Sequence, residues 1–221
     1  MKKVHFIKRR LKYDGTKYSF QVDEIKDFQG KKGIREQLIH PGAVALVVLD
    51  EDERIILNRQ YRYTVDEVLY EIPAGTLEDG ESPLHCAKRE IVEETGYEAG
   101  ELTLLCKYYS SPGISTEFIY LYLARDLKKI TDHPIGHKEE GIENYRFTLK
   151  EAKKMALDGK LMDAKTILGI LHAYLYLDKL KRQTRKQQYT QANQTNRTAK
   201  EKPLSPRPQK TKRAGRRKKS S

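Results

Sequence analysis

The sequence predicts an α+β fold built on a mixed sheet. The first observation is the apolar run at residues 43–49, which is rich in Val and follows Pro41-Gly42, so it suits a buried strand. The second is a series of shorter alternating or β-branched segments on both sides of that run. The third is helical periodicity late in the chain, where Ile167, Ile170, Leu171 and Tyr174 recur at i, i+3, i+4 and i+7.

Turn residues such as Asp14-Gly15 and Pro41-Gly42 divide the chain into these elements. Strands are expected over residues 3–13, 18–28, 33–39, 43–49, 54–61, 102–109, 118–124 and 145–147. The first helix begins at Ser82-Pro83, because Ser is a good N-cap and Pro suits the first helical position, and it ends near Gly96. Two further helices are expected over residues 149–157 and 163–180.

Charge divides the chain into regions. The whole chain carries a net charge of +12, but residues 181–221 contain fifteen Lys or Arg and one acid, Glu201. That segment also lacks apolar periodicity, so we predict a disordered basic tail. Residues 1–40 are expected to form N-terminal strands and residues 41–180 the main folded domain. In the simplest interpretation the tail is solvated. Alternatively it contacts nucleic acid, and no other part of the chain is expected to do so.

Composition excludes other classes of protein. No stretch approaches the roughly 20 apolar residues of a membrane span, and no secretory signal is recognisable, so neither a membrane partner nor export is expected. The cysteines, Cys86 and Cys106, lack metal-ligand spacing and are expected to be buried thiols. A reducing, cytoplasmic setting is therefore predicted.

Three carboxylates gather on the first predicted helix. Glu90 and Glu94 are one turn apart and share a face with Glu93 beside them, whereas Leu84, Ala87 and Ile91 are expected to pack inward. A solvated surface helix often carries such charges. However, Glu90 and Glu94 are like charges at i, i+4, and a hard cation such as Mg²⁺ would relieve their repulsion.

The segment from Gly75 to Tyr97, GTLEDGESPLHCAKREIVEETGY, resembles the Nudix box. In family notation this box is G, five residues, E, seven residues, R-E-U-x-E-E-x-G-U, where U is bulky and apolar. The matching residues are Gly75, Glu81, Arg89, Glu90, Ile91, Glu93, Glu94 and Gly96. Only Tyr97 departs from the pattern. The resemblance implies a Nudix-type α/β/α sandwich with a mixed sheet.

Roles follow from this resemblance. Glu90, Glu93 and Glu94, with the carbonyl of Ala74, would bind Mg²⁺ or Mn²⁺. Arg89 would hold these catalytic carboxylates in place, and Glu93 is a rival candidate for the general base. Paired metals would activate water and neutralise the phosphoryl oxygens of a pyrophosphate.

Wider similarity, over about residues 7–175, points to the ADP-ribose pyrophosphatase branch. The segment around Arg35-Glu36 and His40-Pro41-Gly42, the RQYRY segment at 59–63 and the EIPAG segment at 71–75 resemble that branch. A Pro fifteen residues beyond the box is typical of it, and Pro112 stands fifteen residues after Tyr97. The candidate substrate-binding residues are Arg35, Arg62, Glu71, Pro112 and Gly113.

The branch also carries a mobile catalytic glutamate, and Glu139 or Glu140 falls at that position. Without the family, these residues are an ordinary charged loop. The resemblance further implies a homodimer formed through the N-terminal strands. Some relatives stack adenine on Trp, which this chain lacks, so Tyr18, Phe20 or Phe28 would substitute unless these residues serve packing alone.

The predicted reaction is metal-dependent hydrolysis of ADP-ribose to AMP and ribose 5-phosphate. Two alternatives stay open: a hydrolase of another nucleoside diphosphate sugar such as GDP-mannose, and an RNA-associated Nudix protein. Intact Glu90, Glu93 and Glu94 argue against a purely binding role.

Overall fold

The computed structural model describes residues 2–130 and 141–200, and the side chains as far as residue 191. The chain divides into two compact units after Asp178. This division lies two residues before the boundary predicted from the change in charge.

The centre of the main sheet is strand β4 (Ala43–Leu49), which is buried along its whole length. It pairs in parallel with β9 (Phe118–Lys129) and antiparallel with β5 (Arg54–Arg62). The seven-stranded sheet has the order β10-β5-β4-β9-β8, with β6 added to β5 and β7 added to β4. The remaining strands are β6 (Glu67–Glu71), β7 (Ala74–Thr76), β8 (Tyr97–Tyr109) and β10 (Glu143–Thr148). The sheet is mixed, as predicted.

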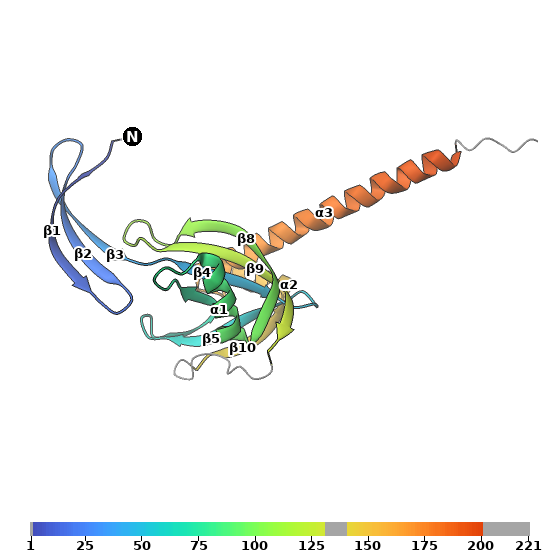
Figure 1. Ribbon diagram of the computed structural model, residues 1–221, viewed down its shortest axis with the longest axis horizontal. Coiled ribbons are helices and arrows are strands. Elements are labelled where there is room, and N and C mark those ends of the chain that lie inside the picture. The colour runs from blue at the N-terminus through green and yellow to red at the C-terminus, as the bar shows by residue number, and fades with distance from the viewer. Residues whose placement is uncertain (1, 131–140, 201–221) are drawn as a thin grey trace, which may run out of the picture. The chain divides into compact units, whose positions relative to one another are not determined.

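Helices cover both faces of this sheet (Figure 1). On one face, Val44, Leu46 and Val48 form a core with residues of α1 (Pro83–Thr95). On the other face, α3 (Ala164–Lys200) approaches so closely that a Cβ on Gly169 would lie 3.1 Å from Val47 Cγ2. The third helix, α2 (Leu149–Leu157), contacts β5 and β10. The predicted α/β/α sandwich is therefore confirmed.

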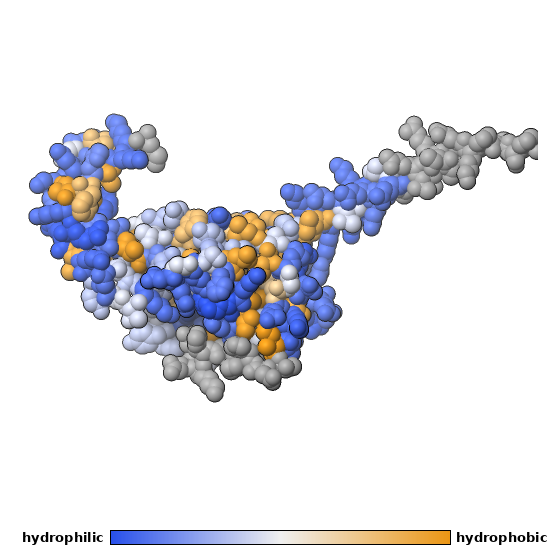
Figure 2. Space-filling view, in the orientation of Figure 1, coloured by the Kyte–Doolittle hydropathy of each residue, from blue (hydrophilic) through white to orange (hydrophobic). Residues whose placement is uncertain are grey.

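The N-terminal strands form a separate three-stranded antiparallel sheet. Its order is β1 (His5–Asp14), β2 (Ser19–Lys26) and β3 (Lys32–Ile39). The sheet is tied to the loop before β9, because Leu38 N donates to Ile114 O and Leu38 O accepts from Thr116 N, at 2.8 and 3.0 Å. This confirms the predicted small N-terminal sheet. Every residue of β1 is exposed, including several apolar ones (Figure 2).

The structure corrects two local predictions. Strands β6 and β7 were not predicted, because they are short and gain most of their hydrogen bonds from β5 and β4 rather than from a clear pattern of their own. Leu84 was expected to pack inward with Ala87 and Ile91, and this is wrong for Leu84. Its side chain is 45% exposed in the first turn of α1, whereas Ala87 and Ile91 are buried.

The C-terminal helix is longer than predicted. Helix α3 was expected to end near Leu180 and the chain to be disordered from residue 181, but it continues to Lys200. Good helix formers and the absence of Gly or Pro between residues 170 and 202 permit this, despite the repulsion among the basic residues. No helix in the described ranges combines the length and apolar character that a membrane crossing needs.

One buried hydroxyl pins α3 to the main sheet. Thr166 is fully buried, and its Oγ1 accepts a hydrogen bond from Ile72 N at 2.8 Å. Asp163 caps the N-terminus of the helix at the same residue, because its Oδ2 accepts a hydrogen bond from Thr166 N at 2.9 Å. Residues 94 positions apart are thus joined through a single side chain.

We predict that Thr166→Val lowers the free energy of unfolding by about 1–3 kcal/mol, because a buried N–H loses its acceptor while the side-chain shape is kept. Chemical denaturation monitored by circular dichroism measures this. The matched control is Thr184→Val on an exposed part of the same helix, which should change stability by less than about 0.5 kcal/mol. Equal stability of the two variants would contradict the anchoring role of Thr166.

Candidate active site

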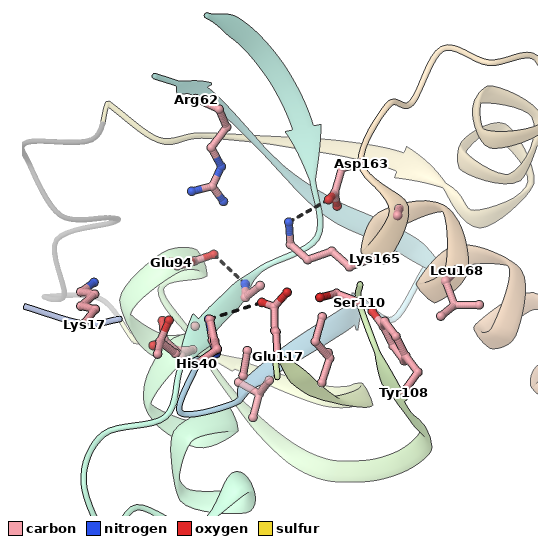
Figure 3. Close-up of a pocket in the computed structure, with 18 of the residues that line it drawn as sticks. Lys17, His40, Arg62, Glu94, Tyr108, Ser110, Glu117, Asp163, Lys165 and Leu168 are labelled. Atoms are coloured by element: carbon pink, nitrogen blue, oxygen red, sulfur yellow. Dashed lines mark hydrogen bonds and ion pairs between the residues drawn. The ribbon is translucent and has the colours of Figure 1, made fainter. Parts of the chain in front are cut away.

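A pocket of about 610 Å³ opens where α1, α3 and the main sheet meet the turn between β1 and β2 (Figure 3). Segments far apart in the sequence supply its wall. The polar and charged residues that line it are Lys17, Tyr18, His40, Gln60, Arg62, Thr76, Glu90, Glu94, Tyr108, Ser110, Glu117, Asp163 and Lys165. Two of the three predicted box carboxylates are therefore in this pocket.

Those two carboxylates, Glu90 and Glu94, are buried rather than solvated, with exposures of 7% and 9%. Glu94 accepts hydrogen bonds from Asn58 Nδ2 and from Ala74 N. Burial, together with the neighbouring charge of Glu90, raises the pKa of Glu94 to about 8. Burial likewise raises the pKa of Glu90, and Arg89 opposes this. The pair is thus poised to gain from a cation.

Glycine at position 75 makes room for the first of these carboxylates. A Cβ at Gly75 would lie 1.8 Å from Glu90 Cδ, which is a severe overlap. The carboxylate of Glu90 therefore packs directly on the backbone of β7, where Ala74 also lines the pocket. The first residue of the predicted box is required by this contact.

Arg89 organises the carboxylates around it. Its guanidinium donates to Glu81 Oε1 and Oε2 at 3.1 and 3.0 Å, to Glu90 Oε1 at 2.6 Å and to Glu93 Oε2 at 3.1 Å. The hydrogen bonds from Arg89 hold the pKa of Glu81 down at about 2. Glu93 does not line the main pocket. It lines, with Glu90 and Arg89, another pocket of about 490 Å³.

The charges of the main pocket favour a bound cation. Four carboxylates line it, from Glu90, Glu94, Glu117 and Asp163, against three cations, from Lys17, Arg62 and Lys165. A cation held by Glu90 and Glu94 would offset the negative charge at that end of the pocket. Within residues 2–130 and 141–191, no three His, Cys, Asp or Glu side chains are arranged as a complete ligand set. Glu90 and Glu94 fit Mg²⁺ as a pair of hard oxygen donors, and Ala74 and Glu93 remain predicted ligands.

The predicted substrate-binding pair Arg62 and Glu71 is joined by a bidentate ion pair, with Nε and Nη2 of Arg62 at 2.7 and 2.8 Å from the two oxygens of Glu71. Lys165 Nζ donates to the same carboxylate. Glu71 is 1% exposed and does not line the pocket, but it holds two cationic side chains that do. Burial opposes its ionisation, and the two cations outweigh burial so that its pKa is lowered.

A histidine and a tyrosine stack at the end of the pocket nearest the N-terminal sheet. The rings of Tyr18 and His40 lie 4.8 Å apart at 24°. His40 Nδ1 accepts from Gly42 N at 2.9 Å, so the proton is on Nε2, which faces Glu117 Oε1 at 3.5 Å. Burial lowers the pKa of His40, and Glu117 opposes this shift. Among Tyr18, Phe20 and Phe28, only Tyr18 is a lining residue.

Other predicted site residues lie elsewhere. Arg35 is exposed on β3, and Pro112 and Gly113 are exposed in the turn before β9, so none of the three lines the pocket. Their roles stay predictions. Glu139 and Glu140 lie outside the described residues.

Sequence reasoning missed several lining residues, among them Gln60, Tyr108, Asp163 and Lys165. Gln60 lies within the RQYRY segment, so the resemblance to the branch could have identified it. No spacing could have paired Lys165 with Glu71, because 94 residues separate them.

Comparison with known proteins is consistent with this geometry. The family model described as "NUDIX domain" matches residues 39–167. The chain is 35% identical to an ADP-ribose pyrophosphatase of Bacillus subtilis (strain 168), over 74% of this chain and 88% of that protein. It is 34% identical to a methanol dehydrogenase activator of Bacillus methanolicus, over 76% of this chain and 91% of that protein.

A GDP-mannose pyrophosphatase of Salmonella arizonae (strain ATCC BAA-731 / CDC346-86 / RSK2980) is 32% identical, over 80% of this chain and 91% of that protein. The fold matches a crystal structure of an ADP compounds hydrolase with a TM-score of 0.66 and 20% identity, covering 80% of this chain and 93% of that one. With the box carboxylates, Arg89 and Gly75 in these positions, the chain belongs to the Nudix hydrolase family.

Proposed function

We propose that this protein hydrolyses the pyrophosphate bond of ADP-ribose to AMP and ribose 5-phosphate, with Mg²⁺ as cofactor and Mn²⁺ as a substitute. The observation that carries the proposal is the pairing of buried Glu90 and Glu94 with cationic Arg62 and Lys165 in one pocket. The similarity to a protein named ADP-ribose pyrophosphatase favours this substrate over other diphosphates.

The residues of the chain divide the work of such a reaction. When bound, Mg²⁺ would activate water and neutralise charge on the diphosphate. Glu90 and Glu94 would hold it, and Arg89 keeps Glu90 in position through its 2.6 Å hydrogen bond. Arg62 offers a guanidinium that Glu71 has already oriented, which lowers the entropy lost when phosphate binds. Glu139 or Glu140, and Glu93 as their rival, remain the proposed general bases.

The base of the nucleotide would stack at the N-terminal end of the pocket. Tyr18 is 38% exposed and its ring already stacks on His40, so one aromatic face is available near the pocket wall. A tyrosine ring accepts any purine by stacking, so this feature alone does not select adenine over guanine. A GDP-sugar such as GDP-mannose is therefore the second candidate, and the relative of that name supports it.

The direct test is a panel of substrates incubated with full-length protein and Mg²⁺. It contains ADP-ribose, GDP-mannose, a diadenosine polyphosphate and a nucleoside triphosphate, and kcat/KM is measured for each. We expect ADP-ribose to rank first and EDTA to abolish turnover. A higher kcat/KM for GDP-mannose would identify it, instead of ADP-ribose, as the substrate. Turnover that EDTA leaves unchanged would contradict the proposed dependence on a metal.

We further propose a homodimer formed through the N-terminal sheet. Leu11 and Tyr13, two residues apart on β1, are 51% and 67% exposed, and adjacent exposed apolar side chains of this kind suit an interaction surface. A second subunit would cover this sheet and could bring Arg35 to the other pocket. We also propose a cytoplasmic setting, which the unpaired Cys86 and Cys106 support.

We predict that Leu11→Asp/Tyr13→Asp converts a dimer into a monomer, because two buried charges would be introduced into the interface. Sedimentation equilibrium measures the mass. Leu157→Asp, which changes an exposed residue of α2, should leave the dimer intact. A monomeric wild-type protein, or a dimeric double variant, would contradict the proposed interface.

We predict that Glu94→Gln lowers kcat by about a hundredfold or more, because a charged ligand is lost from the metal site. The fold should be retained, since Gln can still accept from Asn58 and Ala74 and the repulsion with Glu90 disappears. The control is Glu98→Gln, an exposed change close by. Near-normal turnover at saturating Mg²⁺ would exclude Glu94 from the metal site.

We predict that truncation after Leu180 leaves kcat/KM for ADP-ribose within about threefold of the full chain. The compact unit that contains the pocket ends at Asp178, and the basic excess lies beyond it. Any RNA binding should be lost on truncation and should weaken steeply with salt in the full chain. A large fall in kcat would show instead that the tail takes part in the site.

A further inference from the structure

The end of the pocket at α3 contains a lysine whose ammonium group contacts two carboxylates. Lys165 is 18% exposed at its side chain, and its Nζ donates to Glu71 and to Asp163 Oδ1, the latter at 3.0 Å. Asp163 is itself held, because its other oxygen caps α3 at Thr166 N. The ammonium is therefore held by two carboxylates, one of them buried and the other bonded to the start of α3.

This lysine has one donor left for a ligand. An ammonium carries three N–H groups. Glu71 and Asp163 accept two of them, and Lys165 has no further hydrogen-bond acceptor in the part of the chain that the structure describes. Lys165 lines the pocket, and Figure 3 shows its head on the same side of the pocket as the guanidinium of Arg62. The third N–H is thus available to a molecule in the pocket.

A tyrosine hydroxyl at the same end lacks a partner as well. The hydroxyl of Tyr108 is buried and makes no hydrogen bond to any described residue, although Tyr108 lines the pocket. Tyr108, Asp163 and Lys165 line the same pocket. Burial raises the pKa of Tyr108, and the charge of Asp163 raises it further. A buried hydroxyl without a partner is costly and needs an explanation such as a bound ligand.

Charge at this end of the pocket does not oppose an anion. Arg62 and Lys165 carry two positive charges, and Glu71 and Asp163 carry two negative charges. The negative oxygens are engaged by Arg62, Lys165 and Thr166. The donors that remain, an ammonium N–H and a phenolic O–H, both suit an oxygen acceptor with negative charge.

We propose that Lys165 and Tyr108 are binding residues for a phosphate oxygen of the substrate, in a subsite next to Arg62. This inference rests on the proposed function, because it assigns one phosphate of the diphosphate to the end of the pocket at α3. Glu71 is the positioning residue of the subsite, since it holds both Lys165 and Arg62. Glu90 and Glu94, the proposed metal ligands on α1, would then hold a cation beside the same diphosphate.

The test measures KM and kcat for ADP-ribose in full-length Tyr108→Phe, Lys165→Met and Lys165→Arg proteins. We expect KM to rise about tenfold in Tyr108→Phe and in Lys165→Met, with kcat within about threefold, because each variant loses one hydrogen bond to a charged group. Lys165→Arg should recover most of the affinity. Tyr109→Phe and Lys160→Met are matched controls on exposed neighbours that do not line the pocket, and both should behave as wild type.

A binding measurement separates the subsite from the choice of substrate. Inorganic pyrophosphate is titrated calorimetrically into each protein in EDTA, and its Kd should rise about tenfold in Tyr108→Phe and Lys165→Met. Wild-type protein that binds pyrophosphate in this Lys165-dependent way but leaves ADP-ribose intact would refute the proposed substrate and support the subsite. KM and Kd within twofold of wild type in Tyr108→Phe would overturn the subsite, and this variant keeps the side-chain volume if Lys165→Met fails to fold.

Discussion

The burial of two like charges on one helix face is the constraint on which the rest of the site depends. Carboxylates that leave water without compensation cost several kcal/mol each. Glu90 and Glu94 are compensated from three sides, by Arg89, by Asn58 and by the backbone N–H of Ala74. Their raised pKa values show that this compensation is incomplete. A divalent cation would supply the remainder, so the geometry that is costly in the free protein becomes favourable when a metal binds.

A second buried carboxylate joins the cationic half of the pocket to the fold. Glu71 contacts Arg62 from β5 and Lys165 from α3, while the next residue, Ile72, is bonded to Thr166 of the same helix. The start of α3 is therefore positioned by the same contacts that orient Arg62 and Lys165. A change in the packing of α3 against the sheet would therefore move Lys165 relative to Glu90 and Glu94 on α1.

The net charge of the protein and the charge of its pocket come from different parts of the chain. The net charge of +12 comes from the segment beyond residue 180, whereas the pocket is lined by more carboxylates than cations. In the proposed function, an anionic substrate would therefore be held by individually oriented donors and by a bound cation rather than by a broad positive field. The basic segment is helical as far as Lys200, which presents its charges along a regular element.

The sequence by itself determined the box, the limits of α1 and most strands, because these depend on local signals: a Ser-Pro start, helical spacing and a Val-rich run. It also placed Glu90 and Glu94 on one face, since helical periodicity requires that. Only the tertiary structure decided that these carboxylates are buried and that Gly75 must lack a side chain. It also decided that Lys165 and Tyr108 meet Arg62 at one pocket. The contact between Lys165 and Glu71, for example, joins residues 94 positions apart. Sheet pairing and helix packing bring such residues together, and no short-range pattern predicts them.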